Sequence, residues 1–299
     1  MSEHDWLAEQ FERYRPQLTA VSYRMLGSHA EADDAVQDSW IRVSRSGAAG
    51  VDNLGGWLTT IVARVCLNML RSRNVRREDP AGFRLPDPVV SLDDGPGPEQ
   101  EALLADSVGL ALQVVLDTLA PAERLAFVLH DMFDLPYEDI APMVGRTPVA
   151  ARQLASRARR RVQGADVRAP DPDLGAQRAV VSAFFAAARG GDFDGLVAVL
   201  DPGVVLRSDG GAQRAGATQV LRGAAAVAGR AVLFSQPGAV VWPALVNGAA
   251  GVVVTVAGRP VSVMGFTVAN GKIAEILSLV DPDRLARLDL SAITGEPAP

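Results

Sequence analysis

The segment Val144–Arg161 constrains the fold of this chain more than any other stretch, because it predicts a helix whose start is marked twice. Thr147 is suited to the N-cap, where its side-chain oxygen accepts a backbone N–H, and Pro148 follows at the first helical position, where a missing N–H costs nothing. The residues expected on the inner face are Val149, Leu154, Ala158 and Val162. From Arg146 to Arg161 the segment contains no acidic residue. It therefore predicts a basic helix, entered through a tight turn at Gly145.

Two shorter helices are expected before the basic helix. One begins near Pro121 and covers Leu119–His130, and the other covers Pro136–Val144, where Pro142 kinks or shortens it by removing a ladder hydrogen bond. A short helix, a turn and a basic helix form the order of a helix-turn-helix DNA-binding unit. The alternative is a solvated, arginine-rich surface helix. The turn and the preceding helices favour DNA binding.

Residues 6–74 predict a bundle of helices with one acidic and one basic surface. Ser28 can cap a helix over residues 30–43, whose exposed face carries Asp33, Asp34, Gln37 and Asp38. Paired acids can hold a metal or transfer protons, but no histidine or cysteine accompanies them. We therefore expect a solvated or partner-facing surface, with no metal site.

A third helix over residues 56–73 becomes basic toward its end. Arg64, Asn68 and Arg71 follow i, i+4, i+7 spacing and therefore share one face, which Arg73, Arg76 and Arg77 extend. The simplest interpretation is a favourable charge at a helix C-terminus. However, the chain carries a net charge of −6, and its basic residues are concentrated at 64–77 and 146–161. This distribution favours a bipartite nucleic-acid surface over indiscriminate binding.

The rest of the chain is of a different kind. Residues 78–106 are rich in proline and acid and predict a linker, and a second break falls at residues 168–173. Helices over 179–188 and 193–200 are followed by strand-like runs at 204–207, 240–245, 251–256, 261–268 and 273–280, with a hairpin turn at Asn270-Gly271. We expect an α+β domain with an antiparallel curved sheet.

The single cysteine, Cys66, excludes a disulfide framework and a thiolate metal site, and we expect it to be buried. The sequence shows no signal peptide and no long uncharged apolar run. These features predict a cytoplasmic protein with no membrane partner and no cofactor.

Taken together, three segments resemble an extracytoplasmic-function (ECF) RNA polymerase sigma factor: Ala32–Asp38, Gly56–Thr60 and the helix-turn-helix ending Ala151–Arg159. Gly191–Leu196, leading into Asp201–Val204, is similar to the SnoaL-like (NTF2-like) cone, which a subgroup of these sigma factors carries as a fused tail. The resemblance implies two all-α sigma domains, a region 2 helical bundle and a region 4 helix-turn-helix, followed by an α+β SnoaL/NTF2-like cone. The implied boundaries are 6–77 for region 2, 78–106 for the linker, 107–166 for region 4 and 174–290 for the cone.

The resemblance also implies roles for individual residues. Those expected to bind core RNA polymerase, through its beta and beta-prime subunits, are Asp34, Gln37, Asp38 and Trp40. Those expected to bind the −10 element of promoter DNA are Arg64, Asn68, Arg71, Arg73, Arg76 and Arg77. Those expected on the −35 reader are Arg146, Arg152, Gln153, Arg157 and Arg160.

Three motifs resemble interdomain contacts of the same subgroup. The residues implied in these regulatory contacts are Leu85, Pro86, Asp87 and Pro88 in the linker, Asp209, Gly210 and Gly211 in a loop of the cone, and Asp281, Pro282, Asp283 and Arg284 near its end. Arg84 and Asp281 depart from the subgroup's usual tryptophan and asparagine. The cone is therefore expected to regulate the sigma module within one chain, with room for a small ligand that nothing in the sequence identifies.

Catalysis by the cone is the alternative to regulation. SnoaL-like enzymes usually rely on an Asp or a His–Asp pair, whereas His4, His29 and His130 all lie outside this domain. The candidate bases within it are Asp192, Asp194 and Asp209. With no paired partner visible, we expect no enzyme. The remaining alternative is a helix-turn-helix regulator, acting without polymerase and fused to a small-molecule-binding or catalytic cone.

Overall fold

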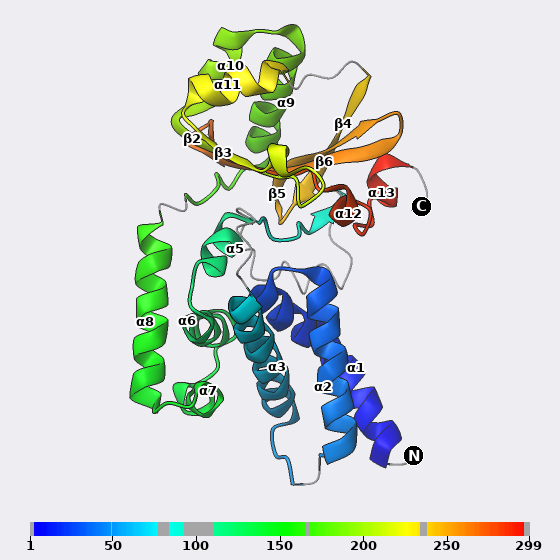
Figure 1. Ribbon diagram of the computed structural model, residues 1–299, viewed down its shortest axis with the longest axis vertical. Coiled ribbons are helices and arrows are strands. Elements are labelled where there is room, and N and C mark those ends of the chain that lie inside the picture. The colour runs from blue at the N-terminus through cyan, green and yellow to red at the C-terminus, as the bar shows by residue number, and fades with distance from the viewer. Residues whose placement is uncertain are drawn as a thin grey trace. The chain divides into compact units, whose positions relative to one another are not determined.

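The computed structural model describes residues 3–48, 50–76, 84–92, 110–165, 168–233 and 238–295 (Figure 1). The chain divides into two compact units. Unit 1 consists of Met1–Pro80, Glu101–Asp106 and Leu112–Val167, and unit 2 consists of Ala81–Gln100, Ser107–Ala111 and Arg168–Pro299.

Unit 1 is helical throughout its described part. Its elements are α1 (Glu3–Leu26), α2 (His29–Ser46), α3 (Leu54–Arg76), α5 (Leu110–Asp117, whose first two residues belong to unit 2), α6 (Pro121–Phe127), a π-helical turn η1 (Val128–Met132), α7 (Tyr137–Val144) and α8 (Pro148–Gly164). The expected helices are therefore all present. Pro142 lies inside α7, which has only eight residues.

The predicted start of the basic helix α8 is confirmed. The Thr147 Oγ1 accepts a hydrogen bond from the Ala150 N–H at 3.3 Å, and Pro148 occupies the first turn. Gly145 ends α7 with φ of 65°, in the left-handed region that favours glycine.

Two details of the helix predictions were wrong. Val149 does not lie on the inner face of α8, since its side chain is 68% exposed, and the buried residues are Ala151, Ala155 and Ala158. Small side chains allow α8 to lie close to α6 and α7, whereas Val149 in the first turn remains exposed. Ser28 does occupy the N-cap of α2, but its side chain makes no capping hydrogen bond.

A single hydrophobic core runs through unit 1. It includes Phe11 and Val62 from the helices α1 and α3 as well as Leu125 and Ile140 from α6 and α7. Helix α3 contacts both α6 and α7. Cys66 is fully buried in this core, and burial raises the pKa of its thiol to about 12. The two helical segments that the sequence separates by a linker thus share one interior.

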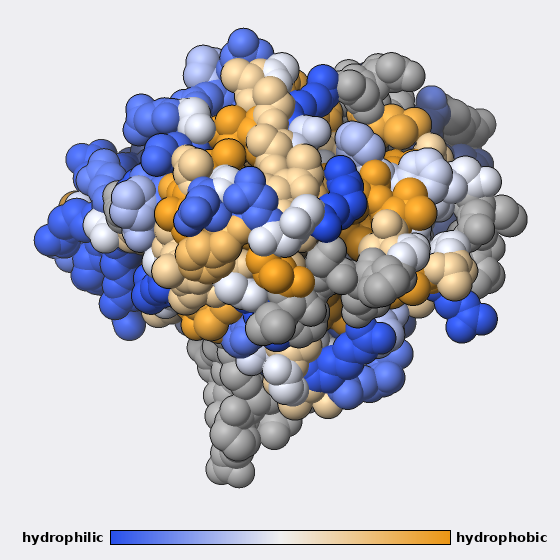
Figure 2. Space-filling model, turned by 90° about the horizontal axis from the view of Figure 1, so that it is seen from above, coloured by the Kyte–Doolittle hydropathy of each residue, from blue (hydrophilic) through white to orange (hydrophobic). Residues whose placement is uncertain are grey.

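Unit 2 is a helix-covered curved sheet. The helices are α9 (Leu174–Gly190), α10 (Phe193–Val199), α11 (Ala224–Leu233), α12 (Pro282–Leu285) and α13 (Ser291–Thr294), with a 3-10 turn η2 (Ala215–Ala217). The strands are β1 (Val90–Ser91), β2 (Leu200–Asp209), β3 (Gln219–Arg222), β4 (Ala239–Val246), β5 (Ala249–Val256), β6 (Arg259–Ala269) and β7 (Lys272–Leu279). In Figure 1, α9, α10 and α11 lie together on one face of the sheet. Figure 2 views the molecule from above, the side of α10 and α11 in Figure 1, and shows hydrophobic residues toward the middle of this face.

The sheet order is β1-β4-β5-β6-β7-β2-β3. The α+β prediction is confirmed, and so is the Asn270-Gly271 hairpin between β6 and β7, where both residues have positive φ. The expectation of a purely antiparallel sheet was wrong, because β2 and β7 pair in parallel. Four strands and α11 separate these two strands in sequence, and the chain returns beside β2 in the same direction.

The linker contributes a strand to unit 2. Residues Val90–Ser91 form β1, which pairs antiparallel with the end of β4, and Asn247 exchanges hydrogen bonds with Val89 from the following turn. From Leu85 to Ser91 every residue is buried. The part of the linker that the structure describes is therefore integral to the fold of unit 2, whereas the sequence suggested only an irregular connection.

Candidate nucleic-acid interface and linker cluster

The acidic face predicted on α2 is present. Asp34, Gln37 and Asp38 are exposed, while Ala35, Val36 and Ser39 on the opposite side of the helix are buried. Trp40 differs from the other residues predicted here, because it is half-buried and its ring centroid lies 5.1 Å from that of Phe11. The carboxylates thus form an open negative surface, with the indole at the margin of the core.

The polar face predicted on α3 is divided by the structure. Arg64, Asn68 and Arg71 are exposed together along one side of the helix. Arg73 instead forms an ion pair with Glu31 and donates to the Leu26 carbonyl oxygen at 3.1 Å. The Arg76 side chain and all of Arg77 lie outside the described residues. Three of the six predicted contacts therefore lie on one exposed surface.

The predicted reader on α8 is exposed along its outer side. Arg146, Arg152, Gln153, Arg157 and Arg160 all have exposed side chains. The Arg152 guanidinium lies 5.3 Å from the centroid of the Tyr137 ring on α7. Arg157 donates to a Glu123 carboxylate oxygen at 2.9 Å and remains 48% exposed. Four guanidinium groups and one amide thus face outward around a rigid helix, which is the geometry needed to reach phosphates and base edges.

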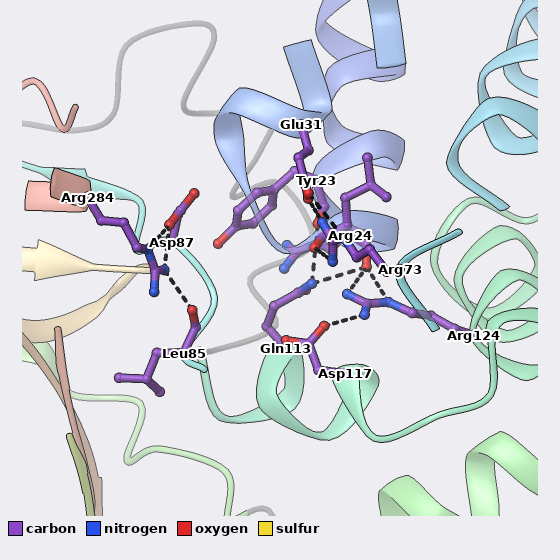
Figure 3. Close-up of polar contacts among 11 residues, drawn as sticks. Tyr23, Arg24, Glu31, Arg73, Leu85, Asp87, Gln113, Asp117, Arg124 and Arg284 are labelled. Atoms are coloured by element: carbon purple, nitrogen blue, oxygen red, sulfur yellow. Dashed lines mark hydrogen bonds and ion pairs between the residues drawn. The ribbon is translucent and has the colours of Figure 1, made fainter. Parts of the chain in front are cut away.

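Unit 1 also contains a set of polar contacts at the end of α1 that the sequence did not predict (Figure 3). We name its residues, Arg24, Gln113, Asp117 and Arg124, the junction cluster. The Arg124 guanidinium donates to the Arg24 carbonyl oxygen from Nε at 3.1 Å and from Nη2 at 2.9 Å, and it pairs with Asp117. Gln113 Nε2 donates to the same carbonyl oxygen at 3.1 Å. The cluster therefore satisfies the C-terminal carbonyls of α1 with side chains from α5 and α6.

In unit 2 the linker motif meets both cone motifs around one buried arginine. The Arg284 guanidinium donates to an Asp87 carboxylate oxygen at 2.7 Å and to the Leu85 carbonyl oxygen at 2.6 Å (Figure 3). It also donates to an Asp209 carboxylate oxygen at 2.7 Å. The same Asp209 oxygen accepts the Leu85 N–H at 2.8 Å. We name Leu85, Asp87, Asp209 and Arg284 the linker cluster. All four residues are at most 9% exposed.

The remaining predicted regulatory residues hold this cluster in place. Asp281 caps α12 by accepting the N–H groups of Asp283 and Arg284, with Pro282 in the first turn. Gly211 has φ of 62°, and a Cβ at this position would lie 2.0 Å from an Asp281 carboxylate oxygen. A Cβ on Gly210 would lie 2.2 Å from the Arg214 carbonyl oxygen. Pro86 and Pro88 are buried beside Asp87. The three sequence motifs thus form one site.

The three carboxylates considered as catalytic bases are an ion-pair partner, a helix cap and an exposed side chain. Asp209 binds Arg284, Asp192 caps α10 by accepting the Gly195 N–H at 2.8 Å, and Asp194 is exposed. Among the residues that the structure describes, no group of three or more His, Cys, Asp or Glu side chains is arranged to hold a metal. No helix in the described part of the chain combines the length and apolarity needed to cross a membrane.

Comparison with known proteins finds matching families for both helical segments and relatives over nearly the whole chain. Residues 10–76 match the Sigma-70 region 2 family and residues 109–162 match the Sigma-70 region 4 family. The chain is 35% identical to the probable ECF RNA polymerase sigma factor SigI of Mycobacterium tuberculosis, with 95% of this chain and 97% of that protein covered. It is also 35% identical to SigJ of the same organism, with 96% of each covered. The crystal structure of SigJ matches over 98% of this chain and 100% of that one, with a TM-score of 0.74 and 32% identity.

Proposed function

The chain belongs to the ECF RNA polymerase sigma factors, and on that premise we propose that it binds core RNA polymerase in the cytoplasm and directs promoter-specific initiation of transcription. The observation that carries the proposal is the pairing of two surfaces in one helical unit: an open acidic face on α2 and outward polar faces on α3 and α8. A repressor that acts without polymerase needs the second of these surfaces but has no use for the first.

In this proposal each surface has one partner. Asp34, Gln37 and Asp38 bind a basic surface of the core enzyme, with Trp40 at the edge of the contact. Arg64, Asn68 and Arg71 hold the −10 element as single-stranded DNA, where the arginines bind phosphate and Asn68 contacts a base. On α8, Gln153 and the neighbouring arginines read the −35 element in the major groove.

The packed state of unit 1 cannot serve both promoter elements at once. Helix α6 contacts both α3 and α8. Packed helix axes lie about 8–10 Å apart, so the axes of α3 and α8 are separated by roughly 20 Å where they meet α6. Positions −10 and −35 are about 25 base pairs apart, which is roughly 85 Å of straight duplex. We therefore infer that region 4 separates from region 2 when the factor engages a promoter.

The linker cluster gives unit 2 control over that separation. The segment from Leu85 to Ser91 belongs to the only covalent connection between α3 and α5, and it is buried in unit 2. While these residues are bound in unit 2 they cannot extend, so they do not lengthen the chain that connects regions 2 and 4. Unit 2 thus regulates the sigma module by holding or releasing the linker.

Run-off transcription with purified core polymerase and DNA from upstream of the gene tests the sigma function. We expect transcripts that depend on the full chain, and their loss in the double variant Asp34→Lys, Asp38→Lys, together with loss of core binding. The matched control is Glu9→Lys, which changes an exposed acid on α1. If DNA binding persists but neither core binding nor transcripts occur with the unaltered protein, the chain is a regulator that acts without polymerase.

The regulatory step is tested by a substitution that removes one linker contact and leaves the backbone unstrained. Asn247 has φ of 51° and accepts the Val89 N–H at 3.1 Å, so Asn247→Gly keeps the turn and removes only the side-chain bonds. We expect more transcript from this variant. Asn270→Gly, at a turn with φ of 54° distant from the linker in the sheet, is the control. Equal transcription from both variants and the unaltered chain would remove the support for linker control.

A further inference from the structure

Unit 2 contains a cavity that none of the roles above uses. Its volume is about 370 Å³, and its walls come from α9, α11 and the inner face of β2, β4, β5, β6 and β7. Apolar side chains such as Phe184, Phe185, Val254 and Met264 line most of it. This volume falls at the lower end of the range of small-molecule pockets, about 300–1,000 Å³, and the apolar lining is typical of them.

The charged side chains of the described cavity lining are all positive. Arg189, Arg214 and Arg230 line the cavity, and none of the described lining residues is acidic. Arg230 is half-buried on α11, and burial lowers the pKa of its guanidinium. With the Gln219 amide oriented so that its oxygen faces Arg230, this oxygen accepts from Nε and Nη2 at 2.7 Å each. This amide is neutral and adds no negative charge to the cavity wall.

We propose that the cavity binds a small amphipathic carboxylate, with its hydrocarbon part among the phenylalanines and valines and its carboxylate on the Arg230 guanidinium. The planar guanidinium matches a carboxylate with two parallel hydrogen bonds. Ser262 and Ser278, whose hydroxyl oxygens lie 3.0 Å apart, provide further polar atoms on the wall. The described lining holds no carboxylate, imidazole or thiol that could exchange a proton with a ligand. The site is therefore assigned as a receptor pocket.

The cavity and the linker cluster share a strand. Ser208 on β2 lines the cavity, and the next residue, Asp209, holds Leu85 and Arg284. Successive side chains of a strand point to opposite faces, so the two sites lie on opposite sides of β2. Ser278 on β7 and Val280, directly after this strand, also line the cavity, and the next residue, Asp281, caps α12. An effect of the ligand on the linker rests on the proposed function, whereas binding itself does not.

Binding is tested on the full chain without polymerase, by calorimetric titration with decanoate, its neutral counterpart 1-decanol and the cation decylammonium. We expect saturable binding of one decanoate, with an affinity about tenfold or more above that of decanol, because a charge-assisted bidentate contact is worth at least that factor. Decylammonium is expected to bind most weakly. Equal affinities, or no saturable binding of decanoate, would overturn the assignment.

Three variants test where in unit 2 the ligand binds. Arg230→Gln is expected to remove the preference for decanoate over decanol while leaving decanol binding unchanged. Val254→Phe, which fills the cavity, is expected to abolish binding of both. Arg259→Gln removes an exposed arginine of the same unit that does not line the cavity, and it is expected to bind as the unaltered chain does. Equal loss in Arg230→Gln and Arg259→Gln would show a general charge effect and contradict the proposal. If Arg230→Gln does not fold, the decanoate–decanol comparison on the unaltered chain decides.

Discussion

The two polar clusters are built on the same plan and differ in the partners of their arginine. Each centres on a buried guanidinium that donates to a backbone carbonyl oxygen and pairs with acid. In the linker cluster, Arg284 faces two buried carboxylates, Asp87 and Asp209. In the junction cluster, Arg124 faces one carboxylate, Asp117, whose side chain is 28% exposed, and the end of a helix.

This difference determines the free energy needed to break the contacts of each cluster. Without Arg284, the carboxylates of Asp87 and Asp209, whose side chains are 13% and 3% exposed, lose the guanidinium that binds both, which is unfavourable for each. When α6 leaves α1, by contrast, the Arg24 carbonyl oxygen and the partly exposed Asp117 can return to water. The junction cluster is suited to a contact that opens and closes, and the linker cluster to one that is held until something acts on unit 2.

The largest effect is expected at the linker cluster. Arg284→Met should destabilise unit 2 by about 3–5 kcal/mol, because it leaves two buried charges uncompensated. Hydrogen exchange resolved by peptide should show faster exchange over residues 84–92 and little change in α1–α3. Arg287→Met removes an exposed arginine three residues further along and should leave exchange unaltered. A loss below about 1 kcal/mol would mean that the two carboxylates are not paired as described.

A smaller effect is expected at the junction cluster. Arg124→Met should cost about 1.5–3 kcal/mol, the range for hydrogen bonds made by a charged group, and loosen the contact between α1 and α6. The buried Cys66 thiol reports this opening, since with a pKa of about 12 it is protonated and shielded at pH 8. A disulfide reagent should therefore label it faster in Arg124→Met than in Arg284→Met. The reverse order would contradict the comparison.

The loop that supports Arg284 is expected to be less sensitive than Arg284 itself. Gly211→Ala should cost about 1–3 kcal/mol, because alanine is strained at φ of 62° and its Cβ would collide with Asp281. Gly216→Ala, where a Cβ would meet nothing within 4 Å, is the control and should be nearly neutral. Thermal unfolding of the two variants tests this. Equal melting temperatures would show that the Asp209–Gly211 loop adapts freely.

The smallest effect is expected at a partly exposed ion pair, between Arg168 and Asp201. Arg168 donates to Asp201 at 2.6 Å, and this hydrogen bond, followed by that from the Gly203 N–H, lowers the pKa of the Asp201 carboxyl from 3.8. A lowered acid pKa stabilises the fold above the ordinary pKa, and the contribution is lost as the pH falls through the lowered value. Arg168→Gln should cost at most about 1 kcal/mol at pH 7 and less below pH 3.8. A cost that grows as the pH falls would contradict this assignment.

The sequence predicted best the features that depend on local rules. The cap at Thr147, the left-handed Gly145 and the Asn270-Gly271 turn follow from the conformational preferences of single residues, and all three are confirmed. Spacing alone also placed Arg64, Asn68 and Arg71 on one exposed face. Local rules failed at Val149, because the inner face of α8 depends on how closely its neighbours pack.

The features that were missed depend on distant residues. Strand β1 has only two residues, too few for any periodicity, and its partner Val246 lies more than 150 residues away. Strand β3 and helix α11 were also not predicted; β3 has only four residues, and α11 consists mostly of alanine, glycine and valine. For the linker cluster, the resemblance identified the motifs, but the ion pairs that join them could be seen only in the structure.

Strand β1 has one more consequence, which concerns association between molecules. It covers the end of β4 at Leu245 and Val246, at one edge of the seven-stranded sheet. A sheet edge with unpaired N–H and C=O groups is a template for pairing with a strand from another chain. In the released state proposed above, this end of β4 becomes such a template. The two residues of β1 therefore also protect the molecule against edge-to-edge self-association, and the released state is the one exposed to it.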